Sequence, residues 1–84
     1  MEWPDTIKRD GCVAHRPEME LAWKEWRFGD RTCSRLAACL ERSGGRNVDG
    51  VKKWPFHRLA DAMLQRARQA GEIEYQKGKW RSLK

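Results

Sequence analysis

The chain has 84 residues, of which 39% are hydrophobic and 36% charged, so it forms one small domain whose compact core depends on large side chains. Long amphipathic stretches exclude a disordered polar chain, and no apolar run approaches the roughly 20 residues that would cross a bilayer. The net charge of +6 lies entirely in residues 51–84, because residues 1–50 carry nine basic and nine acidic side chains.

Residues 1–16 show no sustained hydrophobic period, so we predict an extended N-terminal arm. The acidic opening, MEWPD, lacks the apolar segment of a secretory signal. The three cysteines are an odd number without a dense spacing pattern, which is typical of reduced thiols in the cytosol. We therefore expect a cytoplasmic protein that makes no membrane contact.

Three helices are predicted from apolar residues that recur at helical spacing. The first covers about residues 17–28, with Pro17 suited to its first turn, and the second covers about residues 31–43. The third covers about residues 55–70 and ends at Gly71. The three apolar stripes are Met19, Ala22, Trp23 and Trp26; Cys33, Leu36, Ala37 and Leu40; and Phe56, Leu59, Ala60, Met63 and Ala67.

The segment AGEIEYQKGKWRSL predicts a β-hairpin over about residues 72–83, with Lys77-Gly78 as a two-residue turn. That turn places an aromatic pair and an opposite-charge pair across the two strands, and both favour the register. Because an isolated hairpin is marginally stable in water, its apolar face is expected to pack on the helices. The predicted facing pairs are Ile73–Ser82, Glu74–Arg81 and Tyr75–Trp80.

The segment LADAMLQRARQAGEIEYQKGKWRSL, residues 59–83, combines an amphipathic helix with a two-stranded ending. Four residues mark its elements: Gly71 after the helix, Ile73 at the start of the first strand, Gly78 at the turn and Trp80 in the second strand. In this order the segment resembles the winged helix-turn-helix family. The resemblance implies a mainly α fold over residues 17–84, with three helices and a C-terminal β-hairpin as the wing. The connection over residues 44–54 is longer than in a compact helix-turn-helix.

The resemblance also implies how DNA would be bound. The third helix would enter the major groove, while the wing would contact phosphates or the adjacent minor groove. Arginine and glutamine read guanine and adenine edges, and both occur opposite the apolar stripe of this helix; the alternative is an ordinary solvated helix surface. The predicted binding residues are Lys52 and Lys53 before the helix, His57, Arg58, Gln65, Arg68 and Gln69 on it, and Lys77, Lys79 and Arg81 in the wing.

Two tryptophans, Trp3 and Trp54, have no periodic partners. If exposed, they would mark a protein contact or a base-stacking site. The alternative is that they cover the ends of a small core, and the general burial of tryptophan favours it.

Metal binding and catalysis find little support in the sequence. Cys12 and His15 have ligand spacing, but Cys33 lies on a predicted buried stripe and is better interpreted as a small core residue than as a zinc ligand. No phosphate-binding loop, nucleophile elbow or two-histidine metal motif occurs. We therefore expect no metal, no cofactor and no enzymatic activity.

The basic charge of residues 51–84 is typical of a protein that binds a polyanion, although a merely solubilising surface is the alternative. The leading hypothesis is a small transcriptional regulator that binds double-stranded DNA as a monomer or weak dimer. The second hypothesis is a phage-type inhibitor or adaptor that docks on a host protein or nucleoprotein complex, such as a defence nuclease or a polymerase. Small size and a basic, tryptophan-rich composition look like those of such accessory proteins.

Overall fold

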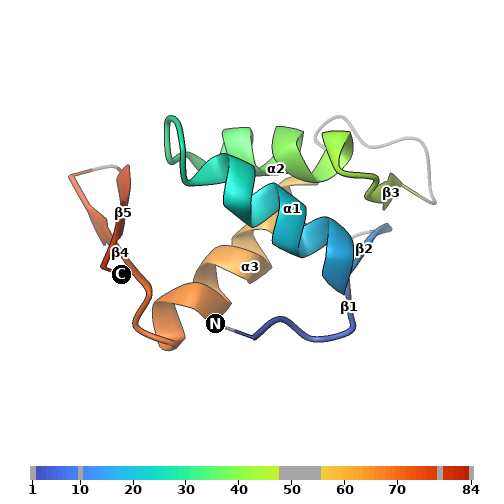
Figure 1. The fold of residues 1–84 in the computed structure, drawn as a ribbon, viewed down its shortest axis with the longest axis horizontal. Helices are drawn as coiled ribbons and strands as arrows, with labels where there is room; N and C mark the ends of the chain where they lie inside the picture. The colour runs from blue at the N-terminus through green and yellow to red at the C-terminus, as the bar shows by residue number, and fades with distance from the viewer. Residues whose placement is uncertain (1, 10, 48–55, 78, 84) are drawn as a thin grey trace.

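The protein is described by a computed structural model covering residues 2–9, 11–47, 56–77 and 79–83. Three helices form its centre, and two small antiparallel sheets stand at opposite ends of them (Figure 1). One sheet has the strand order β1-β2-β3 and the other consists of β4 and β5. In chain order the elements are β1 (Thr6–Arg9), β2 (Cys12–His15), α1 (Arg16–Trp26), α2 (Cys33–Arg42), β3 (Arg46–Asn47), α3 (His57–Gln69), β4 (Ile73–Gln76) and β5 (Lys79–Ser82).

The three predicted helices are present, each slightly shorter than expected. At the start of α1, the Glu18 carboxylate accepts a hydrogen bond from the His15 backbone N–H at 3.1 Å, as in a capping box. At the start of α2, the Thr32 hydroxyl accepts one from the Arg35 backbone N–H at 3.2 Å. Within the described residues, no helix has the length and apolar character required to cross a bilayer.

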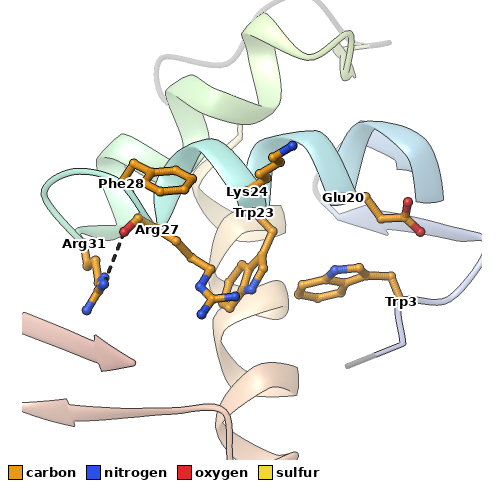
Figure 2. A pocket seen from close by; sticks show the side chains of 7 residues that line it. All are labelled: Trp3, Glu20, Trp23, Lys24, Arg27, Phe28 and Arg31. Atoms are coloured by element: carbon orange, nitrogen blue, oxygen red, sulfur yellow. Dashed lines mark hydrogen bonds between the residues drawn. The ribbon is translucent and has the colours of Figure 1, made fainter. Parts of the chain in front are cut away.

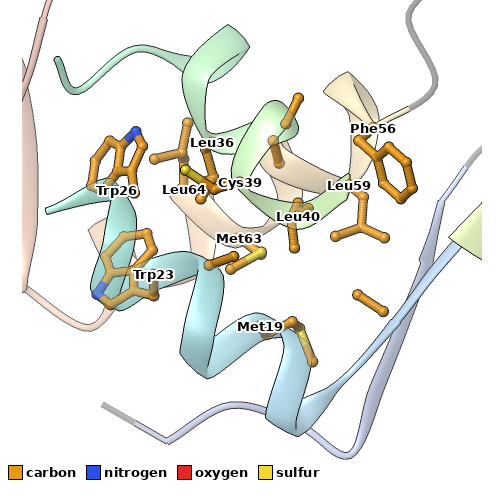
Figure 3. Close-up of a cluster of buried hydrophobic side chains, with 14 of the residues drawn as sticks. Met19, Trp23, Trp26, Leu36, Cys39, Leu40, Phe56, Leu59, Met63 and Leu64 are labelled. Carbon is orange, nitrogen blue, oxygen red and sulfur yellow. The ribbon is translucent and has the colours of Figure 1, made fainter. Parts of the chain in front are cut away.

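The core lies where α2 packs against both α1 and α3 (Figure 3). Its centre contains the predicted stripes, with two differences. Cys39 on α2 and Leu64 on α3 are fully buried although neither was predicted, and Cys33 is only partly buried at the margin. Trp26 is fully buried yet satisfied, since its indole N–H donates to the Thr32 carbonyl at 2.9 Å. The largest fully buried side chains are Trp26, Met19, Leu36, Leu40, Leu59, Met63 and Leu64.

The N-terminal segment differs from the predicted arm, because residues 6–15 form the antiparallel hairpin β1–β2. Ile7 faces Ala14 across it, and both side chains are buried against the helices. Gly11, which has a φ of 80°, makes the left-handed turn that joins the two strands. Trp3 is only 4% exposed, so it covers the core, as one of the two alternatives for it proposed.

The connection between α2 and α3 contains a further element that was not predicted. Arg46 and Asn47 form β3, which pairs with Val13 and Cys12 of β2. The long connection therefore starts as the edge strand of the N-terminal sheet. Its remainder, together with Lys52, Lys53 and Trp54, lies outside the described residues.

The C-terminal hairpin has the predicted register, with Tyr75 opposite Trp80 and Glu74 opposite Arg81. Lys77 takes the left-handed conformation, at a φ of 52°, that a two-residue hairpin turn requires. Its packing differs in part from the expectation. Ile73 is buried and Trp80 is half-buried against the core, but Tyr75 is 59% exposed.

Candidate nucleic-acid interface

The outer face of α3 is the first surface that the sequence predicted to bind. The side chains on its inner side, from Leu59 to Ala67, are buried in the core. The outer side exposes three arginines and a glutamine, and the Asp61 carboxylate reduces its positive charge. Gln65 is half-buried between the two sides. The exposed polar residues of this face are Arg58, Asp61, Arg66, Arg68 and Gln69.

His57 does not belong to that outer face. It is partly buried at the start of α3, where its Nε2 lies 3.2 Å from the Ser34 hydroxyl of α2. Its backbone carbonyl accepts a weak hydrogen bond from the Cys33 thiol at 3.7 Å. These contacts join α2 to α3, so the structure gives His57 a packing role at this position rather than an outward one.

The hairpin β4–β5 brings two of the predicted wing residues to the surface, Lys77 and Arg81. Lys79 belongs to β5, and its side chain lies outside what the structure describes. Arg81 donates to the Gln76 side-chain carbonyl at 2.8 Å and lies 4.0 Å from the Glu74 carboxylate. Its charge is therefore partly offset locally, while Lys77 stands at the exposed turn.

A third surface was missed by the sequence analysis. It is a hollow of about 670 Å³ between α1, the turn that follows it and the N-terminal segment. Trp3 and Trp23 form an apolar wall, with ring centroids 5.2 Å apart at an interplanar angle of 68°. Figure 2 shows Trp23 extending from α1, and Arg27 from the residue after it, toward the same hollow beside Trp3. The full lining is Trp3, Glu20, Trp23, Lys24, Arg27, Phe28 and Arg31.

A second hollow, of about 420 Å³, adjoins the first and shares Arg31 with it. The hairpin supplies its other lining residues, Gln76, Lys77, Trp80 and Arg81. Two hydrogen bonds hold the shared segment in place. The Arg31 guanidinium donates to the Arg27 carbonyl at 3.2 Å, and the Trp80 backbone N–H donates to the Arg31 carbonyl at 3.3 Å.

We name the two hollows together the cationic cleft, defined by the lining residues just given. It carries five cationic side chains, Lys24, Arg27, Arg31, Lys77 and Arg81, against the Glu20 carboxylate within the lining and Glu74 beside Arg81. A concave surface of one sign focuses the electrostatic field and attracts anions.

A usable signal for the first hollow was present in the sequence. Lys24, Arg27 and Arg31 recur at spacings of three and four residues, which is one face of a helix continued into the following turn. It was overlooked because these residues lie in the half of the chain with no net charge.

The cysteine and histidine side chains do not assemble into a metal site. Across the part of the chain that the structure describes, no three metal-ligating residues come together. Cys12 points into the core, whereas His15 is exposed and lies 2.9 Å from the Thr6 hydroxyl, so the two face opposite sides of β2. Burial, and secondarily the charge of Asp61, raises the pKa of the Cys33 thiol, which keeps it protonated and poorly nucleophilic at neutral pH.

No protein-family model, curated protein or solved structure matches this chain. The candidate interface therefore rests on the geometry and charge described above.

Proposed function

We propose that the protein binds double-stranded DNA as a winged-helix domain and acts as a small transcriptional regulator. In this proposal α3 is the recognition helix and the hairpin β4–β5 is the wing. One observation carries it: the inner face of α3 is fully buried, while its outer face exposes Arg58, Arg66, Arg68 and Gln69 to solvent. Such a face presents long cationic side chains and an amide donor and acceptor on a rigid element.

The dimensions and connection of α3 support the proposal. Thirteen residues give a helix about 20 Å long, sufficient to lie along the major groove. The helix passes within a few residues into β4, because the Glu72 backbone N–H bonds to the Ala67 carbonyl at 3.0 Å and Ile73 opens the strand. The wing is thereby held at a set position relative to α3.

The residues divide by the kind of contact that each would make. Arg58 and Gln69, near the two ends of α3, are suited to base edges, where a bidentate pair discriminates by about 1–3 kcal/mol. Lys77 and Arg81 are suited to phosphates, which position the protein but carry no sequence information. Asp61 lies on the same face and would weaken phosphate attraction near the centre of the helix.

A second candidate function, docking on a protein partner, is favoured by a different observation. Leu21 on α1 and Phe28 in the turn after it are 59% and 84% exposed. Both line a shallow hollow of about 560 Å³ that also contains Arg42, whose guanidinium is paired with Glu25. Exposed large apolar side chains of this kind are typical of protein contacts.

A salt titration tests the proposal. Binding of a mixed-sequence duplex is measured at several salt concentrations for the wild type and for the double variant Arg66→Gln/Arg68→Gln, which leaves the proposed base contacts in place. We expect the wild type to bind with a steep negative slope of log affinity against log salt. The slope of the variant should shrink by nearly one unit for each phosphate that it no longer neutralises.

The matched control is Arg9→Gln/Arg46→Gln, which removes the same charge from exposed positions in the N-terminal sheet. A general charge effect would lower both variants alike, whereas an α3 interface lowers only the first. Wild-type protein that shows no duplex binding at low salt would contradict the proposal and leave protein docking as the better explanation.

A further inference from the structure

We infer that the cationic cleft binds an unpaired strand of nucleic acid, so that the protein prefers a duplex with a single-stranded extension over a blunt duplex. The inference rests on the proposed function, because it adds a second contact beside the wing. The cleft shares Lys77 and Arg81 with the wing, but Arg27 and Arg31, in the turn after α1, are not among the residues assigned to the duplex. The two sites can therefore be separated by substitution.

The charge of the cleft favours a polyanion over a single small ion. Cations follow one another from Lys24 on α1 and Arg27 just after it, through Arg31, to Lys77 and Arg81 on the hairpin. Three of them are arginines, whose planar guanidinium groups match phosphate oxygens in a bidentate manner. A series of cations along two hollows that share Arg31 is suited to successive phosphates of one strand.

Arg31, at the junction of the two hollows, has donor capacity to spare. Its guanidinium makes one hydrogen bond, to the Arg27 carbonyl, while its Nε is buried and has no hydrogen-bond partner among the described residues. The buried Nε is not reachable from the cleft, so a phosphate would be bound by the terminal N–H groups of the Arg31 guanidinium, a residue that lines both hollows.

The aromatic residues of the cleft favour nucleotides as the anionic polymer. In the first hollow Phe28, which is 84% exposed, is the ring open to stacking, while Trp3 and Trp23 beside it are buried parts of the wall. Half-buried Trp80 lines the second hollow. Cations interleaved with aromatic rings are the combination by which proteins hold single strands, since each base offers a flat face for stacking.

The size of the hollows distinguishes a single strand from a duplex. Volumes of about 670 and 420 Å³ lie in the range of pockets that enclose one small ligand each. They admit a nucleotide whose base is free to turn inward. A base within a duplex is stacked and paired, so its ring faces cannot reach Phe28.

Three probes test the inference by fluorescence anisotropy: a blunt duplex, the same duplex with a short thymidine tail, and an oligo-glutamate with the charge of that tail. We expect the tail to tighten binding about fivefold or more for each base stacked. Tail binding is also expected to quench tryptophan emission, because bases in the cleft would lie beside Trp23 and Trp80, which line the two hollows.

Arg27→Gln should abolish the advantage of the tailed duplex and leave blunt-duplex affinity unchanged. Arg31→Lys keeps the charge but loses the planar fork, and it should reduce the advantage in the same direction. The control is Arg46→Gln, which removes one exposed charge from the N-terminal sheet. Thermal midpoints of all variants establish that they are folded.

The outcomes separate this inference from the proposed function. Equal affinity of the wild type for blunt and tailed duplexes would overturn the inference and leave the proposed function standing. Arg27-dependent binding of the tail without any binding of blunt duplex would support the inference and refute the proposed function. If oligo-glutamate binds as tightly as the tail, the inference that the cleft binds nucleic acid is overturned, and an acidic protein segment is indicated as its ligand instead.

Discussion

The two hairpins of the molecule have similar local structure and different environments. Each pairs two strands of four residues around a tight turn with a left-handed residue, Gly11 in one and Lys77 in the other. The N-terminal hairpin gains a third strand and buries side chains from both of its own. Among the described residues of the C-terminal hairpin, only Ile73 is fully buried, while Tyr75 and Lys77 are exposed to solvent. Strand pairing alone therefore does not determine whether the side chains of a hairpin are buried in the core or exposed to solvent.

Backbone connections extend this contrast. The N-terminal sheet is tied to the helical body by the Arg16 backbone N–H, which bonds to the Asp5 carbonyl at 2.8 Å, and by the salt bridge between their side chains, also at 2.8 Å. The C-terminal hairpin meets the turn that follows α1 through one backbone bond, from Trp80 to Arg31. We expect the N-terminal sheet to unfold only with the whole domain and the C-terminal hairpin to open more readily.

The largest expected effect is on stability at the N-terminal end. Trp3→Ala should reduce the free energy of unfolding by roughly 3–5 kcal/mol, because it removes a nearly buried indole that packs on Trp23. Urea denaturation followed by circular dichroism measures the change. Tyr75→Ala, at an exposed aromatic of the other hairpin, serves as the control and should cost less than about 1 kcal/mol. A reduction below about 1 kcal/mol for Trp3→Ala would mean that the N-terminal segment is detached from the core.

A smaller effect is expected at the C-terminal hairpin. Trp80 is half-buried and contacts Tyr75 edge-on, with centroids 5.1 Å apart at 63°. Trp80→Ala should therefore cost about 1–2 kcal/mol, well below the cost of removing a fully buried tryptophan. The same denaturation measurement applies. A cost as large as that of Trp3→Ala would erase the contrast between the two hairpins, and a negligible cost would show that the wing does not pack.

The degree to which the sequence predicted this fold follows from the length of each pattern. Helices α1, α2 and α3 have ten or more residues each, so the period of their apolar residues is readable and most of their core positions were predicted. The C-terminal register was predicted because the Lys77-Gly78 turn and the pairs across it agree. Strands β1 and β2 have four residues each, too few for a clear period, and the Asp10-Gly11 dipeptide was the neglected signal.

The candidate site was predictable only in part, for a different physical reason. Residues that share one element, such as Arg58 and Arg68 on α3, are placed by helical geometry alone. The cationic cleft instead combines Arg27 and Arg31 with Arg81, which is fifty residues away from Arg31 in the sequence. Only the docking of the hairpin on the turn after α1 brings these groups together, and no local pattern encodes that docking.

The smallest expected effect concerns the charges of the two hairpins, and it tests whether their difference extends to function. Lys77 and Arg81 are exposed on the C-terminal hairpin, and Lys8 and Arg9 are exposed on the N-terminal one. Replacing either pair by glutamine removes the same net charge. If the wing contacts phosphate, the first double variant should weaken binding to all duplexes alike, and the second should leave it unchanged.

The two wing residues should not contribute equally. Lys77→Gln should reduce the slope of log affinity against log salt by nearly one unit, as expected for one phosphate contact. Arg81→Gln should reduce it by less, because Arg81 already lies 4.0 Å from the Glu74 carboxylate and donates to Gln76. Glu74→Gln should then steepen the slope by freeing Arg81. Equal reductions for the pairs on both hairpins would show that duplex DNA senses only net charge, and the wing would lose its assigned role.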